Sequence, residues 1–298
     1  MKEKTVYALG FFDGVHLGHQ ALLQACKSLA EAHGCKAAAV TFSTHPDTLV
    51  LGKTPGLINT IEDRVRLLKA FGMDDVVVLP FDKRMQTMPW QDFLEMLRIN
   101  QNAAGLVCGY DFRFGNRGAG NARSLGAYCR ENGMVWEVVP EQTLDDIAVS
   151  STHIRNLLEE GKMEAAAKFL GHPHILSGEV ISGRRLGRNL GIPTANLALP
   201  EGVLTLPLGV YACRVRIGEQ SYMAVTNIGF RPTVGGHHVT VEPWILDFDA
   251  DLYGRHITLE LHSFLRPEKS FASLPELKAE IQKNACQTRE YFEKVKKN

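Results

Sequence analysis

The sequence has no excess of charge of either sign. Its 298 residues include 33 Lys and Arg and 33 Asp and Glu, which gives a formal net charge of +0 at pH 7. General nucleic-acid and membrane-surface binders carry a broad excess of positive charge. We therefore expect neither kind of partner, and any phosphate ligand must be held by a few local groups.

Paired cysteines and long apolar runs are also missing. No stretch approaches the roughly 18 to 20 apolar residues of a membrane helix, and the first residues lack the cleavage pattern of a signal peptide. The scattered cysteines form no CxxC pair, which favours reduced thiols in a cytoplasmic enzyme over disulfides or a zinc site. The six are Cys26, Cys35, Cys108, Cys129, Cys213 and Cys286. We expect a cytoplasmic protein, and nothing in the sequence indicates a particular oligomer.

The first half alternates short apolar runs with amphipathic stretches. Because 45% of all residues are hydrophobic, the chain can bury a sizeable core. The alternation is typical of parallel strands linked by helices. It predicts a Rossmann-like open α/β sheet whose strands are TVYALGF, CKAAAVTF, DDVVVLPF, AAGLVCGY and MVWEVVP.

From about His172 the pattern changes to alternating strands punctuated by Gly and Pro. In segments such as VYACRVRI the larger apolar residues fall at every second position, as half-buried antiparallel strands require. Since closure removes exposed edges, we expect an antiparallel β-barrel. A C-terminal helix should pack on it through the stripe Leu274, Leu277, Ile281 and Ala285. We place the domain boundary after residue 171, giving domains 1–171 and 172–298.

The strongest motif of the first half is GFFDGVHLGHQ, residues 10–20, where the first strand gives way to a helix. Free N–H groups and the positive end of the dipole at a helix N-terminus attract phosphate. His16 and His19 are three residues apart, so both imidazoles can face one ligand. Gly18 leaves room for a phosphate chain. Alone, the pair is equally well a chance feature of a helix start.

A second motif, VSSTHIR, opens the helix after the last strand of this half. Its hydroxyls, on Ser150, Ser151 and Thr152, can cap that helix or donate to phosphate oxygens. Arg155 can neutralise the charge of a departing pyrophosphate. Since open α/β sheets bind ligands at the carboxyl ends of their strands, the two motifs together predict a nucleotide site.

The second half has its own Gly-rich segment, SGRRLGRNLGIPTANL, without the spacing of a P-loop. It is either a basic turn or a phosphate-binding loop. Thr194 and Asn196 offer two neutral oxygens on one side of an extended segment, which suits Mg²⁺ with a nucleotide. Glu242 lies within an apolar strand and is either structurally paired or a base for a hydroxyl nucleophile.

The first half resembles the nucleotidylyltransferase superfamily, and more closely the FMN adenylyltransferase module of bacterial riboflavin kinase/FAD synthetases. GFFDGVHLGHQ, TFSTHP, CGYDFRFGNRGAG and VSSTHIR carry the resemblance. It implies that His16 and His19 bind ATP phosphates and stabilise the transition state as the FMN phosphate attacks the α-phosphorus. Ser151 and Arg155 would hold the β- and γ-phosphates. The other nucleotide contacts would be Gly10, Phe11, Asp13, Gly18, Ser150 and Thr152, and the flavin contacts His45, Asp111 and Phe112.

The second half resembles the riboflavin kinase domain through GRRLGRNLGIPTANL, GVYA, NIGFRPTVGG, VEPWILDFDADLYG and FLRPEKSF, in the family's order. The resemblance implies that Thr194 and Asn196 coordinate Mg²⁺ with ATP. Glu242 would activate the terminal ribityl hydroxyl of riboflavin. The remaining implied contacts are Gly183, Gly187 and Arg188 for phosphate, and Asn227 and Arg231 for flavin.

The two resemblances together predict a bifunctional enzyme that uses Mg²⁺ and takes riboflavin, FMN and ATP. One half would phosphorylate riboflavin to FMN, and the other would adenylylate FMN to FAD with release of pyrophosphate. TFSTHP departs from the family's usual TFDPHP, so a kinase with an inactive or weak first half is an alternative. A class I aminoacyl-tRNA synthetase lacks support, because no KMSKS-like partner follows the histidine motif. A non-catalytic flavin sensor would have little reason to keep Glu242, Thr194 and Asn196 together.

Overall fold

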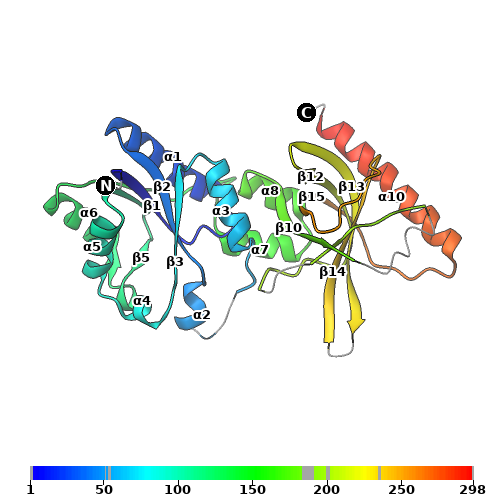
Figure 1. Cartoon of the computed structure of the whole chain (residues 1–298), viewed down its shortest axis with the longest axis horizontal. Coiled ribbons are helices and arrows are strands. Elements are labelled where there is room, and N and C mark those ends of the chain that lie inside the picture. The colour runs from blue at the N-terminus through cyan, green and yellow to red at the C-terminus, as the bar shows by residue number, and fades with distance from the viewer. Residues whose placement is uncertain are drawn as a thin grey trace. The chain divides into compact units, whose positions relative to one another are not determined.

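The computed structural model describes residues 3–50, 52, 55–182, 191–198, 202–233 and 236–296, without the side chains of 231–233 and 236–238. The chain folds into two compact units, Met1–Ser151 and Thr152–Asn298 (Figure 1). The two helices that follow the first sheet therefore group with the second unit. The boundary expected after residue 171 concerns functional domains and stays a prediction.

The first unit is built on a parallel sheet with strand order β3-β2-β1-β4-β7. Its strands are β1 (Thr5–Leu9), β2 (Lys36–Phe42), β3 (Asp75–Leu79), β4 (Ala103–Gly109) and β7 (Val135–Val139). Every pairing between them is parallel. The open α/β sheet and its five strands are confirmed. Chain order reverses at β1, so the crevice between β1 and β4 is where this class of sheet binds ligands.

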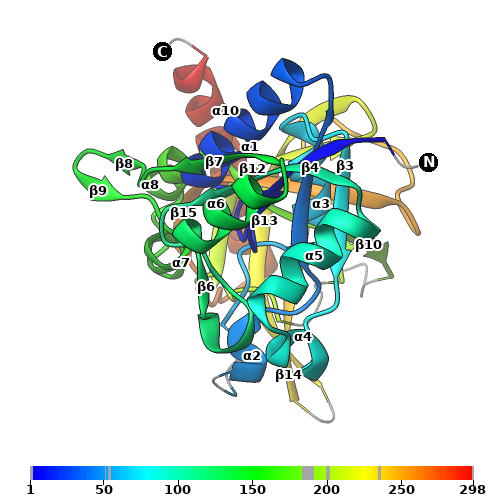
Figure 2. The same cartoon turned by 90° about the vertical axis from the view of Figure 1, so that its left-hand side faces the viewer.

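Helices cover both faces of this sheet (Figures 1 and 2). They are α1 (Leu17–Ala32), α3 (Ile61–Ala70), α5 (Trp90–Asn100) and α6 (Ala122–Glu131). α1 and α3 pack in one apolar core against Val6 and Ala8 of β1, and α5 and α6 pack in a second core against Tyr7 and Leu9. Successive side chains of a strand point to opposite faces, which explains why β1 is buried throughout.

Short elements fill the connections of the first unit. They are α2 (Pro46–Val50), α4 (Lys83–Thr87), β5 (Arg113–Phe114), β6 (Gly120–Asn121), a 3₁₀ turn (Asn116–Gly118), β8 (Thr143–Leu144) and β9 (Ile147–Ala148). β5 pairs with β6, and β8 pairs with β9 in a small hairpin that projects from the unit (Figure 2). Most of these elements lie at the carboxyl ends of the parallel strands, where the candidate site is found.

The second unit is a closed antiparallel barrel in the order β10-β11-β14-β13-β12-β15. The strands are β10 (His174–Ile181), β11 (Asn196–Leu197), β12 (Gly209–Ile217), β13 (Gln220–Thr233), β14 (Gly236–Ile245) and β15 (His256–Pro267). The helices are α7 (Ser151–Glu159), α8 (Met163–Leu170) and α10 (Leu274–Val295). The predicted barrel is confirmed, and closure leaves none of these strands as an open edge.

The C-terminal helix meets the barrel differently from the predicted stripe. Leu274 is 64% exposed, so the prediction that it packs on the barrel was wrong. The buried positions lie in the second half of α10 and include polar groups: Asn284, Ala285, Thr288 and Phe292. Leu277 and Ile281 are partly buried and line a cavity described below.

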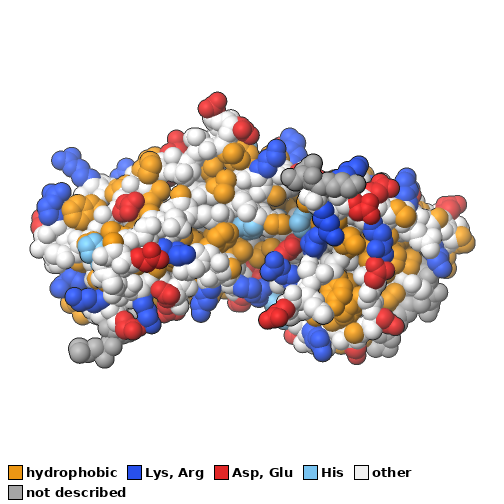
Figure 3. Space-filling model, turned by 90° about the horizontal axis from the view of Figure 1, so that it is seen from above, with side chains coloured by type: hydrophobic (Ala, Val, Ile, Leu, Met, Phe, Trp, Pro, Cys, Tyr) orange, Lys and Arg blue, Asp and Glu red, His pale blue; other side chains and the backbone are white. Residues whose placement is uncertain are grey.

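Two global expectations can be compared with the structure. Among the described residues, every helix is too short or too polar to span a membrane. Acidic and basic side chains are interspersed on the face shown in Figure 3, in line with the formal net charge of +0.

Candidate active sites

The loop between β1 and α1 has an unusual backbone. Phe12, Gly14 and Val15 have φ angles of 61°, 83° and 42°. A β-branched residue such as Val15 rarely adopts a positive φ, and such strain is concentrated at functional sites. The loop is held by Asp13, which is 2% exposed and accepts hydrogen bonds from the backbone N–H of Ile58 at 2.9 Å and of Asn59 at 3.2 Å. The predicted phosphate contact Asp13 is thus an anchor of this loop.

The two histidines of the loop lie side by side, and their predicted contact with one ligand stays a prediction. Their rings stack with centroids 3.6 Å apart and an interplanar angle of 16°. His16 is 6% exposed, and its Nδ1 caps α1 by accepting a hydrogen bond from the His19 backbone N–H at 3.3 Å. Burial, the neighbouring His16 and then Arg64 lower the pKa of His19 well below its ordinary value. His19 is therefore neutral at pH 7.

A cavity of about 280 Å³ lies against the histidine pair, and Ser150 and Ser151 also line it. The Ser151 hydroxyl donates a hydrogen bond to the Asp13 carbonyl oxygen at 2.9 Å, so the second motif is fixed to the first loop. A Cβ on Gly18 would lie 3.2 Å from two atoms of the His16 ring. Gly18 therefore gives space to the imidazole, whereas the sequence had suggested space for phosphate.

Two predicted phosphate ligands, Thr152 and Arg155, lie on α7 in the second unit. Their roles at the histidine cavity stay predictions.

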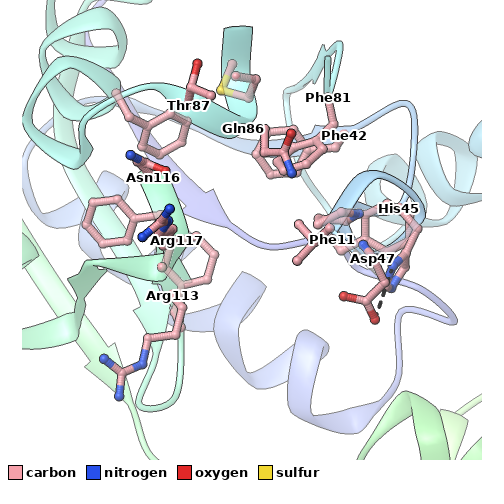
Figure 4. A pocket seen from close by; sticks show the side chains of 18 of the residues that line it. Phe11, Phe42, His45, Asp47, Phe81, Gln86, Thr87, Arg113, Asn116 and Arg117 are labelled. Atoms are coloured by element: carbon pink, nitrogen blue, oxygen red, sulfur yellow. Dashed lines mark hydrogen bonds and ion pairs between the residues drawn. The ribbon is translucent and has the colours of Figure 1, made fainter. Parts of the chain in front are cut away.

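A larger cavity of about 1090 Å³ opens beside the same strand ends (Figure 4). Aromatic rings of Phe11, Phe42, Phe81 and Phe112 line it together with His45. The His45 ring packs edge to face on Phe11 with centroids 4.5 Å apart, and its Nδ1 accepts a hydrogen bond from the Asp47 backbone N–H at 3.2 Å. Flat aromatic walls of this kind suit a planar ring system.

Asp111 lines both the aromatic cavity and the histidine cavity. A ligand in one is thus next to a ligand in the other. The predicted contact Gly10 directly follows β1, lines neither of these cavities, and donates its backbone N–H to the Val40 carbonyl at 3.2 Å. The structure brings together the predicted residues His16, His19, Ser150, Ser151, Phe11, His45, Asp111 and Phe112 around these two cavities.

The second unit places three predicted residues in one row across the barrel. Glu242 of β14 is opposite Asn227 of β13. On the other side, Leu197 pairs with Val241 and the Ala195 N–H bonds to the Pro243 carbonyl at 2.9 Å, which sets Asn196 opposite Glu242. Directly opposed residues project from the same face of a sheet. Asn196, Glu242 and Asn227 therefore share one face.

Two cavities of the second unit meet at Thr194. One of about 350 Å³ is lined by Thr194, Asn227 and Glu242, with apolar walls from Trp244, Phe271, Leu277 and Ile281. The other, of about 630 Å³, is lined by Thr194 together with Gly191, Pro193, Phe248, Asp249, Asp251 and Tyr253. The arrangement can hold two ligands with their reacting ends at Thr194.

Some predicted residues of this half are not described. Gly183, Gly187 and Arg188 lie outside the described residues, as does the side chain of Arg231. The backbone of Arg231 belongs to β13, where it pairs with His238.

Sequence reasoning missed several residues of these sites. Phe42 is the last residue of β2 and Phe81 lies two residues after β3, and an aromatic residue at the end of a strand was a usable signal. Trp244, two residues after Glu242, could have been found by strand alternation. Arg64 lies within an amphipathic helix, where nothing distinguishes it from a solvated charge.

Comparison with known proteins identifies the family. A family model described as FAD synthetase matches residues 1–153, and one described as riboflavin kinase matches residues 170–292. The chain belongs to the bifunctional riboflavin kinase/FMN adenylyltransferase family. It contains both domains of that family in the predicted order, and the kinase-only alternative is not favoured.

Curated members of the family match over nearly their whole length. The chain is 36% identical to the bifunctional riboflavin kinase/FMN adenylyltransferase of Escherichia coli K12 over 296 residues, covering 98% of this chain and 94% of the relative. It is 33% identical to that of Listeria monocytogenes over 293 residues, covering 97% and 93%. Among solved structures, one described as a macrolide-efflux protein from Streptococcus pneumoniae superposes with a TM-score of 0.86 at 29% identity, covering 97% and 95%.

Proposed function

We propose that this chain makes FAD in two steps, each in one of its units. The second unit transfers the γ-phosphoryl group of ATP to riboflavin, giving FMN and ADP. The first unit transfers the adenylyl group of ATP to FMN, giving FAD and pyrophosphate. The observation that carries the proposal is that each unit has two adjoining cavities, which share Asp111 in the first unit and Thr194 in the second. His16 and His19 line one cavity of the first unit, and Glu242 lines one cavity of the second.

In the kinase reaction, riboflavin would occupy the 350 Å³ cavity with its ring system against Trp244 and Phe271. Glu242 would accept the proton of the terminal ribityl hydroxyl while the hydroxyl oxygen bonds to the γ-phosphorus. The bond from that phosphorus to the bridging oxygen breaks, and ADP leaves. Asn227, opposite Glu242, would hold the ribityl chain by hydrogen bonds.

Thr194 and Asn196 fit Mg²⁺, because hydroxyl and amide oxygens are hard ligands and leave room for water and nucleotide oxygens. The row across the barrel places Asn196 next to Glu242. When bound with ATP, Mg²⁺ offsets the charge of the triphosphate.

In the adenylyl transfer, the nucleophile is already an ionised phosphate, so no strong base is required. The task of the first unit is to position two anions and to stabilise the charge at the α-phosphorus. His19 is held neutral, so its ring can donate one N–H to a phosphate oxygen. The Nδ1 of His16 accepts a hydrogen bond from the His19 backbone, which leaves its Nε2 to donate to the ligand. Ser150, Ser151 and Arg155 would hold the leaving pyrophosphate.

The flavin would lie in the aromatic cavity with its phosphate directed toward Asp111, where the two cavities adjoin. We place these reactions in the cytoplasm, in keeping with six cysteines that are all free thiols. Riboflavin, FMN and ATP are the proposed partners, without nucleic acid or membrane.

The test is product chromatography after the protein is incubated with ATP and Mg²⁺ and either riboflavin or FMN. Glu242→Gln should lose at least 100-fold in FMN formation while FAD formation from FMN persists, because general-base catalysis contributes about 10²- to 10⁴-fold. His16→Ala should do the reverse.

Matched controls are Glu219→Gln in the turn after β12 and His33→Ala at the end of α1, both exposed. Binding of flavin without ATP turnover in the wild-type protein would contradict the proposal and support a sensor. Loss of both activities in either site variant would contradict the division between the units.

A further inference from the structure

Arg64 is a fully buried cation next to the adenylyl-transfer site. It lies on α3, and the exposed fraction of its side chain is 0%. A charged side chain is almost never buried to this extent unless it is paired or functional. The role inferred for Arg64 rests on the adenylyl transfer proposed for the first unit.

The guanidinium bridges the loop that follows β1 and the carboxyl end of β2. Its Nη1 donates hydrogen bonds to the Phe11 carbonyl at 3.0 Å, the Phe42 carbonyl at 3.0 Å and the Thr41 hydroxyl oxygen at 3.1 Å. The Thr41 hydroxyl in turn donates to the Phe11 carbonyl at 2.8 Å. Arg64 therefore fixes the backbone at the start of the histidine loop.

The same backbone carries two rings that serve the two cavities. The Arg64 Cζ lies 3.9 Å from the centroid of the Phe11 ring, whose other neighbour is His45 in the aromatic cavity. The ring of the next residue, Phe12, packs edge to face on His19 at 5.2 Å between centroids. If the Arg64 side chain moved, Phe11 in the wall of the aromatic cavity would move with it. Phe12, which packs on His19 of the histidine pair, would move as well.

The charge of Arg64 is only partly compensated. Its Nε and Nη2 groups have no hydrogen-bond partner among the described residues. Burial lowers the pKa of Arg64 to about 10, so the group keeps its charge at pH 7. Taking a cation out of water is costly unless an anion is near. The carboxylates of Asp13 and Glu62 offset part of this effect by raising the pKa of Arg64. A polyphosphate bound beside the histidines would add a further anion.

We propose that Arg64 is a positioning residue for adenylyl transfer. It holds Phe11 and Phe12 in place by its hydrogen bonds, and its buried charge favours ATP at the histidine cavity. Kinase chemistry in the second unit does not depend on it.

The experiment compares Arg64→Lys and Arg64→Met with Lys69→Met, which removes a positive charge from an exposed position on the same helix. FAD formation from FMN is measured at varied ATP and FMN to give kcat and both KM values. The rate of FMN formation from riboflavin is measured in each preparation, and circular dichroism reports folding.

We expect Arg64→Lys, which keeps the charge but not the planar fork, to lower kcat for FAD formation about tenfold with the KM for ATP within threefold of wild type. Arg64→Met should in addition raise the KM for ATP about tenfold. Lys69→Met should match wild type, and all variants should keep the kinase rate. If Arg64→Met fails to fold, the kcat and KM values of Arg64→Lys alone test the inference.

Wild-type kcat and KM in a folded Arg64→Lys or Arg64→Met protein would overturn the inference, as would an equal fall in the kinase rate. Failure of the wild-type protein to make FAD from FMN would instead refute the proposed function, so the two failures are distinguishable.

Discussion

His174 gives the second unit a specific dependence of stability on pH. It lies on β10, is 1% exposed, and neither ring nitrogen has a hydrogen-bond partner among the described residues. Burial first, and then His172, lower the pKa of His174 from 6.5 to about 3. Between these two values the unfolded chain binds a proton that the folded chain does not, so stability falls as the pH drops below 6.5.

The magnitude follows from the two pKa values. At pH 5 the unfolded chain is protonated at this position and the folded chain is not, which costs about 2 kcal/mol relative to pH 7 at 1.36 kcal/mol per unit. His174→Leu removes the titrating group and keeps an apolar side chain of similar size. This variant should lose the 2 kcal/mol difference and be at least as stable as wild type at pH 7, because an unpaired buried imidazole is costly.

Urea unfolding at pH 7 and pH 5 measures the effect. The chain has three tryptophans, so a background with Trp90→Phe and Trp136→Phe leaves Trp244 of the barrel as the only reporter. His256→Leu, at an exposed position of β15, is the control and should keep the wild-type difference. A difference between the two pH values that agrees within 0.5 kcal/mol for wild type and His174→Leu would refute the reasoning.

Other perturbations test the first unit and the metal. Gly18→Ala should lower the rate of FAD formation about tenfold in a coupled pyrophosphate assay, because its Cβ would lie 3.2 Å from the His16 ring, while the melting temperature stays the same or rises since Ala favours a helix. A fall in melting temperature together with the full rate would contradict this. Removal of Mg²⁺ with a chelator should abolish both activities, and added Mg²⁺ should restore them; activity that survives chelation would exclude the proposed role of Thr194 and Asn196.

Periodicity predicted the architecture of both units because the two kinds of burial leave different patterns. Strands buried on both faces, such as β1 with VYAL, form short apolar runs, whereas in VYACRVRI of β12 the larger apolar residues fall at every second place. Burial in β12 is more continuous than this pattern suggests, because residues 209–213 are all buried. The same reasoning misplaced the first turn of α10. Leu274 has the spacing of a core residue, but the buried contacts of this helix lie further along, at Asn284 and Thr288, which no apolar pattern includes.

Site residues could be predicted from the sequence where they belong to a local motif. They could not be predicted where their role depends on contacts with distant parts of the chain. The spacing of His16 and His19 predicted that both imidazoles could face one ligand, and in the structure the two rings stack beside one cavity. The task of Asp13 could not be seen, because its partners Ile58 and Asn59 are far along the chain. Arg64 was hidden for the same reason, since its acceptors lie in the loop after β1 and at the end of β2, both far before it in the sequence.

Strand pairing fixes the positions of Asn196, Glu242 and Asn227, the row of residues proposed for the kinase reaction. β13 and β14 pair continuously from Ala224 with Ile245 to Thr233 with Gly236, so a slip at Glu242 would turn every side chain of β14 to the opposite face. Asn196, by contrast, is held by a strand of two residues. The proposed base is thus fixed by a long run of strand pairing, and the proposed ligand Asn196 by the pairing of β11 with β10 and β14. A fixed carboxylate suits a reaction in which the hydroxyl must be aligned with the phosphorus.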